Sequence, residues 1–190
     1  MRFAMLMVPL AVLGCSDPEA TGRYLIDLPS LQKSLPNRLG SVEIREVSLP
    51  EYAAGQEVAW QTEDGAVRSN PDQVWADAQP RAVTLELARQ ISNVSGATVI
   101  AEPWPLAQSP SRRLEVRVEQ MLARADGTFR LAGQYFVTPD LGGNGADVVR
   151  RFDIAVPIVT GEGDVQDPAL IAKAQALAVQ GLAQQIAQLK

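Results

Sequence analysis

The sequence predicts an α+β domain in which two main amphipathic helices pack on a largely antiparallel β-sheet. Apolar and charged residues alternate over residues 114–119, and residues 129–137 alternate again after the turn over residues 125–128, as in a hairpin with one buried face. Apolar residues recur at three- and four-residue spacing over residues 72–94 and 168–189, which is the period of a helix with one buried side.

The N-terminal third of the chain predicts short strands separated by turns. Residues 24–28 and 42–47 are rich in strand-forming side chains, and a proline follows each run, so each is predicted to be a strand. Residues 57–62 and 66–68 predict a hairpin, because the Asp64-Gly65 pair between them tolerates the positive φ angles of a tight turn.

The middle of the chain predicts a helix followed by one short strand. Val83, Leu87 and Ile91 share one side of the helix predicted over residues 72–94. Residues 97–101 are a short apolar run that predicts a strand, and the two prolines that follow predict that the chain then leaves the sheet.

The C-terminal part completes the sheet and adds the second helix. Residues 148–156 predict the third strand of a meander. Asp167-Pro168 predicts a helix start, because aspartate accepts the unpaired amide hydrogens of the first turn and proline has the φ angle of the first helical position. The predicted apolar stripe of this helix consists of Leu170, Ile171, Ala174, Leu177, Ala178, Leu182, Ile186 and Leu189.

Residues 1–15 have the pattern of a bacterial lipoprotein signal. The apolar run over residues 3–13 is shorter than the roughly 20 residues of a membrane-spanning helix but suits the core of a signal peptide. It leads into Val12-Leu13-Gly14-Cys15, a lipobox that holds the only cysteine of the chain. We therefore expect residues 1–14 to be a cleaved signal, Cys15 to carry fatty acyl chains such as palmitate, and residues 15–22 to be a short tether to the domain over 23–190. Ser16 after the cysteine favours sorting to the periplasmic face of the outer membrane.

The composition of the chain argues against several classes of function. The formal charge is −5 and no basic tract is longer than a pair, which argues against nucleic-acid binding. There is no histidine, so serine–histidine and cysteine–histidine catalysis and histidine-based zinc sites are excluded. Glu162, Asp164 and Asp167 are spaced like part of a calcium loop, but the closing bidentate glutamate is missing. We predict no catalytic residue, no metal site and no cofactor.

The residues that remain as candidates are suited to contacts with a partner. Trp60 and Trp104 lie in or beside predicted loops, where tryptophan serves either as half-buried scaffolding or as an interface anchor. Arginine is favoured at interfaces over other charged residues, so the arginine pairs at strand ends are further candidates. These pairs are Arg112-Arg113 and Arg150-Arg151.

Three segments, in addition to the lipobox, resemble one known family. They are residues 23–28, residues 42–52 with the run Ser48-Leu49-Pro50-Glu51-Tyr52, and residues 74–77 at the predicted helix start. Their order and spacing resemble the ABC-type transport auxiliary lipoproteins, the PqiC/YmbA-like family associated with membrane integrity. Family members usually read Trp-Ala-Glu-Pro where this chain has Trp75-Ala76-Asp77-Ala78, with its proline delayed to Pro80, so the helix entry differs.

The resemblance implies a non-enzymatic lipoprotein anchored in the outer membrane. It implies action beside a mammalian-cell-entry (MCE) domain protein and an ABC transporter or related membrane protein, in a system that moves lipids between membranes. It also implies a homo-oligomeric ring. Two alternatives stay open: an envelope lipoprotein that binds a small hydrophobic ligand in an apolar pocket, and a hydrolase that uses paired carboxylates.

Overall fold

The computed structural model describes residues 20–26, 34–140, 145–159 and 166–189, which form eight strands and three helices. The strands are β1 (Gly22–Tyr24), β2 (Ser41–Ile44), β3 (Glu57–Gln61), β4 (Val67–Trp75), β5 (Thr98–Ala101), β6 (Arg112–Ala123), β7 (Thr128–Pro139) and β8 (Val148–Pro157). The helices are α1 (Glu51–Ala54), α2 (Gln79–Ser95) and α3 (Pro168–Ala187).

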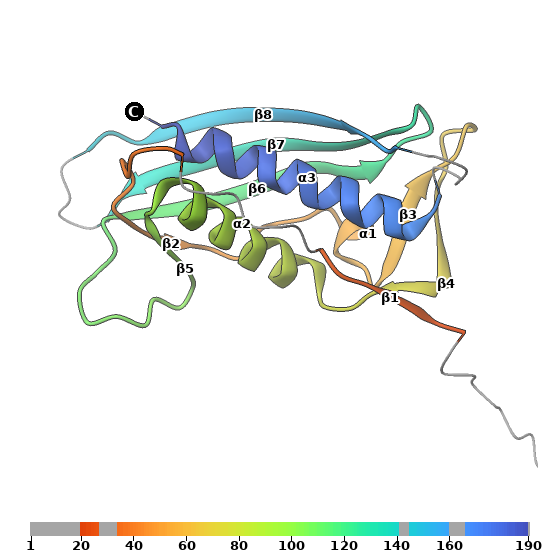
Figure 1. Ribbon diagram of the computed structural model, residues 1–190, viewed down its shortest axis with the longest axis horizontal. Coiled ribbons are helices and arrows are strands. Elements are labelled where there is room, and N and C mark those ends of the chain that lie inside the picture. The colour runs from red at the N-terminus through yellow and green to blue at the C-terminus, as the bar shows by residue number, and fades with distance from the viewer. Residues whose placement is uncertain (1–19, 27–33, 141–144, 160–165, 190) are drawn as a thin grey trace, which may run out of the picture.

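All eight strands belong to one sheet built around the antiparallel meander β6–β7–β8 (Figure 1). Two strands share the other edge of β6: β2 pairs in parallel with its start, where Val42 lies opposite Arg112, and β3 reaches its end, where Trp60 lies opposite Ala123. β5 extends the sheet beyond β2, while β4 and then β1 extend it beyond β3. The predicted α+β class is confirmed. The longest ladders are antiparallel, as is the pairing of β3 with β4, whereas β1, β2 and β5 pair in parallel with their neighbours.

Both long helices lie on the same face of the sheet, so the core fills the space between two layers (Figure 1). α3 packs on β7 and β8, and α2 packs on α3 and β5. Complete burial of one large aliphatic or aromatic side chain contributes about 1.5–3 kcal/mol, so this apolar interface is the main source of stability. Its fully buried members include Val83, Leu87, Ile91, Leu114, Val116, Phe129, Leu131, Ile171, Leu182 and Ile186.

One polar contact joins the two long helices inside the core. The side-chain amide of Gln175 on α3 donates a hydrogen bond of 2.6 Å to Oε1 of Gln79 on α2, and both side chains are buried. A buried amide that loses its partner costs about 1–3 kcal/mol, so this pair penalises other alignments of α2 against α3.

The ends of the long helices follow local signals in the sequence. The Asp167 carboxylate accepts a hydrogen bond of 2.8 Å from the amide of Ala169, and Pro168 is the first residue of α3, which confirms the predicted start. α2 ends at Gly96, whose φ of 70° is left-handed and whose amide donates to the Ser92 carbonyl at 2.7 Å.

The helix predicted over residues 72–94 begins later than the sequence indicates. Residues 72–75 are the end of β4, where Val74 pairs with both β1 and β3 and Trp75 is only 7% exposed. The helix instead begins at Gln79, with Pro80 in its first turn. The prediction was wrong because strand pairing satisfies the backbone of residues 72–75, a long-range interaction that local periodicity does not report.

Three smaller differences have similar causes. The first strand covers Gly22–Tyr24 rather than residues 24–28, because only three residues pair with β4; Leu25 beyond them is 67% exposed. Residues 27 and 28 lie outside the described part of the chain. The short helix α1 was not predicted, and Leu177 of the predicted apolar stripe is 37% exposed on the outer side of α3.

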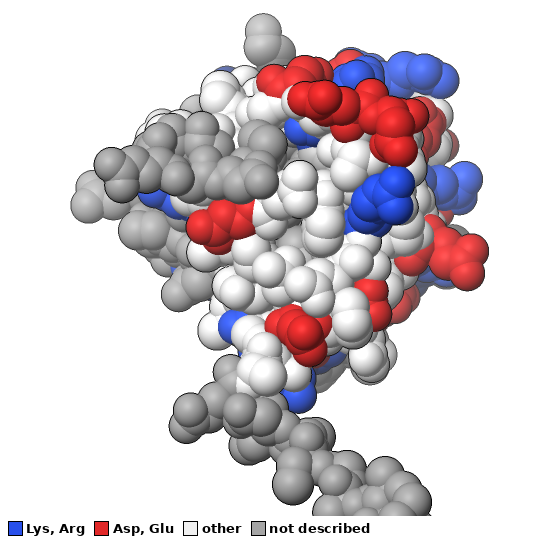
Figure 2. Space-filling view, turned by 90° about the vertical axis from the view of Figure 1, so that its right-hand side faces the viewer, with Lys and Arg blue, Asp and Glu red and all other residues white. Residues whose placement is uncertain are grey.

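The face of the sheet opposite the long helices carries charged side chains. Arg117 forms an ion pair of 2.6 Å with Glu115 and lies 5.0 Å above the ring of Phe136, and Arg130 pairs with Asp153 at 2.7 Å. Figure 2, an end view, shows acidic and basic side chains gathered along one margin of the molecule. Exposed ion pairs contribute little to stability because solvent screens them, and this charged face is a solvated surface rather than a second core.

Candidate functional site

The two tryptophans that are candidates for either scaffolding or a partner interface lie at opposite ends of β6. Trp60 on β3 pairs with Ala123, the last residue of β6, whereas Trp104 lies in the loop that precedes Arg112, its first residue. The first and last of the 12 residues of β6 are 11 steps apart, which at about 3.3 Å per step is roughly 36 Å. The two tryptophans therefore belong to separate surfaces.

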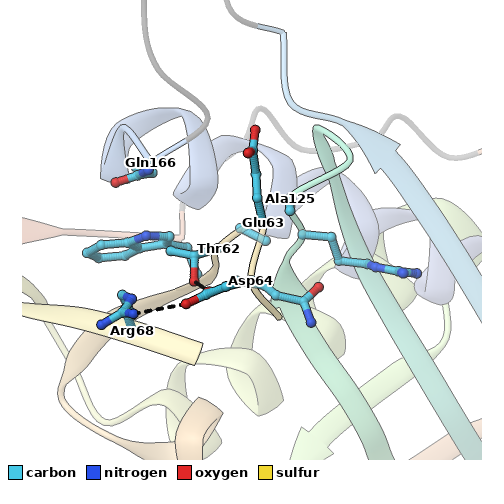
Figure 3. Close-up of a pocket in the computed structure, with 10 residues that line it drawn as sticks. Thr62, Glu63, Asp64, Arg68, Ala125 and Gln166 are labelled. Carbon is cyan, nitrogen blue, oxygen red and sulfur yellow. Dashed lines mark hydrogen bonds and ion pairs between the residues drawn. The ribbon is translucent and has the colours of Figure 1, made fainter. Parts of the chain in front are cut away.

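Trp60 forms part of the wall of an open cavity of about 550 Å³ beside the β3–β4 turn (Figure 3). Three segments that are distant in sequence meet there: the β3–β4 turn, the end of β6 and Gln166 before α3. The described lining residues are Trp60, Gln61, Thr62, Glu63, Asp64, Arg68, Ala123, Arg124, Ala125 and Gln166. Most of them are polar, so the cavity does not suit a hydrophobic ligand.

Two of the charged residues that line this cavity, Asp64 and Arg68, compensate each other. Asp64 accepts hydrogen bonds from the Thr62 hydroxyl and the Ala66 amide and forms an ion pair with Arg68 at 3.2 Å. The hydrogen bond from Thr62 is the largest of the effects that lower the pKa of Asp64, so this carboxylate stays ionised at neutral pH. Figure 3 shows Arg68 and Asp64 directed toward each other and Glu63 directed away from them. The indole Nε1 of Trp60 is buried and has no hydrogen-bond acceptor among the described residues.

Trp104 lies in a loop, residues 102–111, that is held at several points. Its amide donates a hydrogen bond of 2.9 Å to the Glu43 carboxylate on β2. Its indole Nε1 donates one of 2.7 Å to the Gln108 carbonyl across the loop. At the start of the loop the Glu102 amide donates a hydrogen bond of 2.9 Å to the Ile44 carbonyl. At its end the Ser111 amide donates one of 2.9 Å to the Ser41 hydroxyl. The two hydrogen bonds of Trp104 thus stabilise the conformation of the loop.

Arg113 belongs to the same region through a shared carboxylate. Its Nε lies 3.4 Å from the Glu43 carboxylate, which also accepts the Trp104 amide, and 3.2 Å from Oδ1 of Asp140. The structure therefore brings Trp104 and Arg113 together. The sequence alone did not predict this proximity. Glu43 was missed as a member of this cluster, although its place between the buried Val42 and Ile44 directs it to the charged face of the sheet.

The other three candidate arginines are not part of this cluster. Arg112 points to the opposite face of β6 from Arg113, because side chains alternate along a strand. Arg150 and Arg151 are exposed on β8, opposite Tyr135 and Gln134. Burial raises the pKa of the Tyr135 hydroxyl, and the nearby positive charge of Arg150 offsets part of that increase.

Several predicted features lie outside the described residues. These are the signal sequence, the lipidation site Cys15 and two members of the acidic group, Glu162 and Asp164. Among the described residues, no group of acidic or cysteine side chains is arranged to hold a metal ion. In that same part of the chain, none of the helices combines the length and the apolar character needed to span a membrane.

Comparison with known proteins identifies relatives of most of the chain. The chain is 28% identical to the intermembrane transport lipoprotein PqiC of Escherichia coli K12 over 143 residues, which is 72% of this chain and 73% of PqiC. The PqiC of Shigella flexneri matches equally well.

Solved structures share the fold at lower identity. A crystal structure of a Xanthomonas campestris protein has a TM-score of 0.69 at 12% identity, covering 88% of this chain and 93% of that one. A second crystal structure, of a protein without an assigned function, has a TM-score of 0.61 at 21% identity and covers 83% and 97%. The family model of the ABC-type transport auxiliary lipoprotein component matches residues 24–187, and the chain belongs to this family.

Proposed function

We propose that this chain is a non-catalytic, lipid-anchored auxiliary subunit that couples an MCE-type lipid conduit to the outer membrane. Its relative PqiC is an intermembrane transport lipoprotein, and the family model extends over residues 24–187, which is the observation that carries the proposal. An ABC transporter or related membrane protein is the further component of the same lipid transport system. The role of this chain is to tether and to dock, while the conduit carries the cargo.

The proposed anchor places the domain close to its membrane. Cys15 of the lipobox is separated from Gly22, the first residue of β1, by seven peptide steps, which span at most about 25 Å when extended. β1 is hydrogen-bonded to β4, so the chain is held to the fold from that residue onward. A lipid on Cys15 would therefore keep the β1 end of the domain near the periplasmic face of the outer membrane.

A ligand-binding lipoprotein is the alternative, and the described cavities do not favour it. A cavity of about 660 Å³ beside α1, β3 and β4 is open to solvent and has Glu51, Glu57 and Arg68 among its lining residues. The cavity at Trp60 is open and polar. The more apolar hollow between the end of β8 and α3, lined by Pro157, Leu170 and Leu177 among others, has a volume of only about 100 Å³. A drug-sized or lipid-like ligand needs roughly 300–1,000 Å³ of largely apolar cavity.

Affinity purification of the intact lipoprotein from its own membranes tests the proposal. We expect an MCE-domain protein to be recovered with the tagged chain after mild detergent extraction, and to be absent when an unrelated lipoprotein of the same membrane carries the tag. Recovery of the tagged chain alone, with a co-purified lipid, would instead support the ligand-binding alternative.

The proposal includes a ring of several copies of this chain. β8 pairs only with β7 among the described residues, so its outer edge of 10 residues leaves backbone groups without strand partners. Such an edge is a natural place for another chain to pair. We expect size-exclusion chromatography with light scattering to give a mass several times that of one chain; a strict monomer at high concentration would count heavily against the ring.

A further inference from the structure

The loop of residues 102–111 exposes apolar side chains at its tip. Leu106 is 52% exposed, and Pro103, Pro105 and Ala107 are exposed beside it. Glu102 is the only charged residue among these ten. Exposed apolar side chains are common when scattered singly, but a cluster on one projecting segment marks a contact surface.

The loop is ordered although its tip is exposed. Trp104 hydrogen-bonds to Glu43, which joins the loop to β2, and to the Gln108 carbonyl, which joins two parts of the loop. The Glu102 carboxylate also accepts a hydrogen bond of 3.0 Å from the Glu46 amide. A flexible loop loses conformational entropy when binding fixes its backbone, which opposes binding. A loop already held in one conformation avoids that loss, so it is suited to rigid docking.

The loop also lies at the end of the domain opposite the proposed anchor. In Figure 1 the green segment between β5 and β6 is at the left end of the long axis, while β1, where the chain enters the fold, is at the right. The seven-step tether of at most about 25 Å is shorter than the roughly 36 Å of β6 alone. The tether thus holds the β1 end near the membrane, and the loop can extend farther from the membrane than the tether itself reaches.

We propose that residues 102–111 are the docking element of the domain, which inserts Leu106 and its flanking prolines into an apolar groove of a protein partner on the side away from the anchoring membrane. The inference rests on the proposed function for the anchor and for the existence of that partner. A membrane surface is disfavoured as the occupant, because the segment contains no lysine or arginine to attract anionic headgroups. Glu43 is a positioning residue, since it acts on the loop through its hydrogen bond with the Trp104 amide.

The test begins with a photoreactive amino acid in the full-length lipoprotein in its own cells. It replaces Leu106 in one variant and Val67 in the other; Val67 is 45% exposed and lies on β4, beside the turn at the other end of the domain. We expect the probe at position 106 to form an adduct with the same MCE-domain protein that the unmodified chain recovers, and the probe at 67 to form none with it. An adduct at 106 only with lipid or with a second copy of this chain would overturn the inference.

Substitutions give an independent measure of the same contact. Leu106→Ser should reduce partner recovery roughly tenfold or more, as expected for a central apolar contact, and Val67→Ser should change it less than twofold. Glu43→Ala should also weaken recovery, whereas Glu43→Gln should largely restore it because its carbonyl oxygen still accepts the Trp104 amide. Unchanged recovery with Leu106→Ser would refute the docking element and leave the proposed function standing; no recovery with the wild-type chain would overturn both.

Discussion

Gly133→Ala is expected to destabilise the domain by roughly 3 kcal/mol or more, toward the upper end of the range for overpacked cores. Gly133 lies in the middle of β7, opposite Val118 of β6 and Phe152 of β8. A methyl group there would collide with the Arg117 carbonyl oxygen and would lie 2.9 Å from Cα of Val118 and 3.0 Å from the Phe152 ring. Two of these three contacts are backbone, which cannot rotate away as a side chain can.

The cause of this close approach is an irregularity in β6. The pairing of β6 with β7 shifts between Val118 and Gln120, so the backbone of β6 bulges over Gly133. Phe152 stacks on Tyr135 on the helix side of the sheet and closes the remaining space. A side chain at position 133 would therefore have to separate β6 from β7 or displace Phe152 from the core.

Gly181→Ala is the matched control for this prediction. Gly181 lies in α3, where a new methyl group would be 3.6 Å from Ile154, an ordinary contact. Replacing a mid-helix glycine by alanine should stabilise the domain by about 0.5–1 kcal/mol. Equilibrium urea unfolding followed by tryptophan fluorescence measures both effects. A Gly133→Ala variant as stable as the wild type would mean that β6 and β7 are farther apart than the structure indicates.

Cys15→Ala is expected to abolish function while leaving the domain folded. Cys15 is the only cysteine, so its loss removes no disulfide, and it lies outside the described residues that form the sheet. The proposed lipid is the attachment to the membrane, and a water-soluble domain released into the periplasm would be diluted away from its partner. We expect the variant to leave the membrane fraction and to fail to complement loss of the gene.

Ser16→Ala is a suitable control for the anchor, because it changes the neighbouring residue and keeps the lipobox cysteine. It should remain in the membrane fraction and should retain most of the complementation. Full complementation by Cys15→Ala would show that the anchor is not needed, and the proposed tethering role would then be rejected.

Much of the fold could be predicted because several elements carry their own pattern. The strands predicted from the alternation over residues 114–119 and 129–137 are confirmed as β6 and β7. The helix predicted from the spacing of Val83, Leu87 and Ile91 is confirmed as the body of α2. In each case the residues that define the pattern are the ones that become buried. One buried face is enough to produce such a pattern, whatever element covers it.

Elements that depend on distant partners were predicted less well. Nothing near residues 72–75 in the sequence indicates that they extend β4, because their hydrogen-bond partners are on β1 and β3. The parallel pairing of β2 with β5 and β6 joins segments separated by more than fifty residues, and a parallel strand has no turn signal to reveal its neighbour.

The sequence by itself determined the lipobox at Cys15, the family resemblance and the faces of the long helices, because each of these depends on residues close together in the chain. Only the tertiary structure placed Trp60 and Trp104 at opposite ends of β6, joined Trp104 to Arg113 through Glu43, and set the loop of residues 102–111 at the far end from β1. These relations depend on how the strands are ordered in the sheet. That order is decided by long-range pairing and burial, which local sequence patterns do not encode.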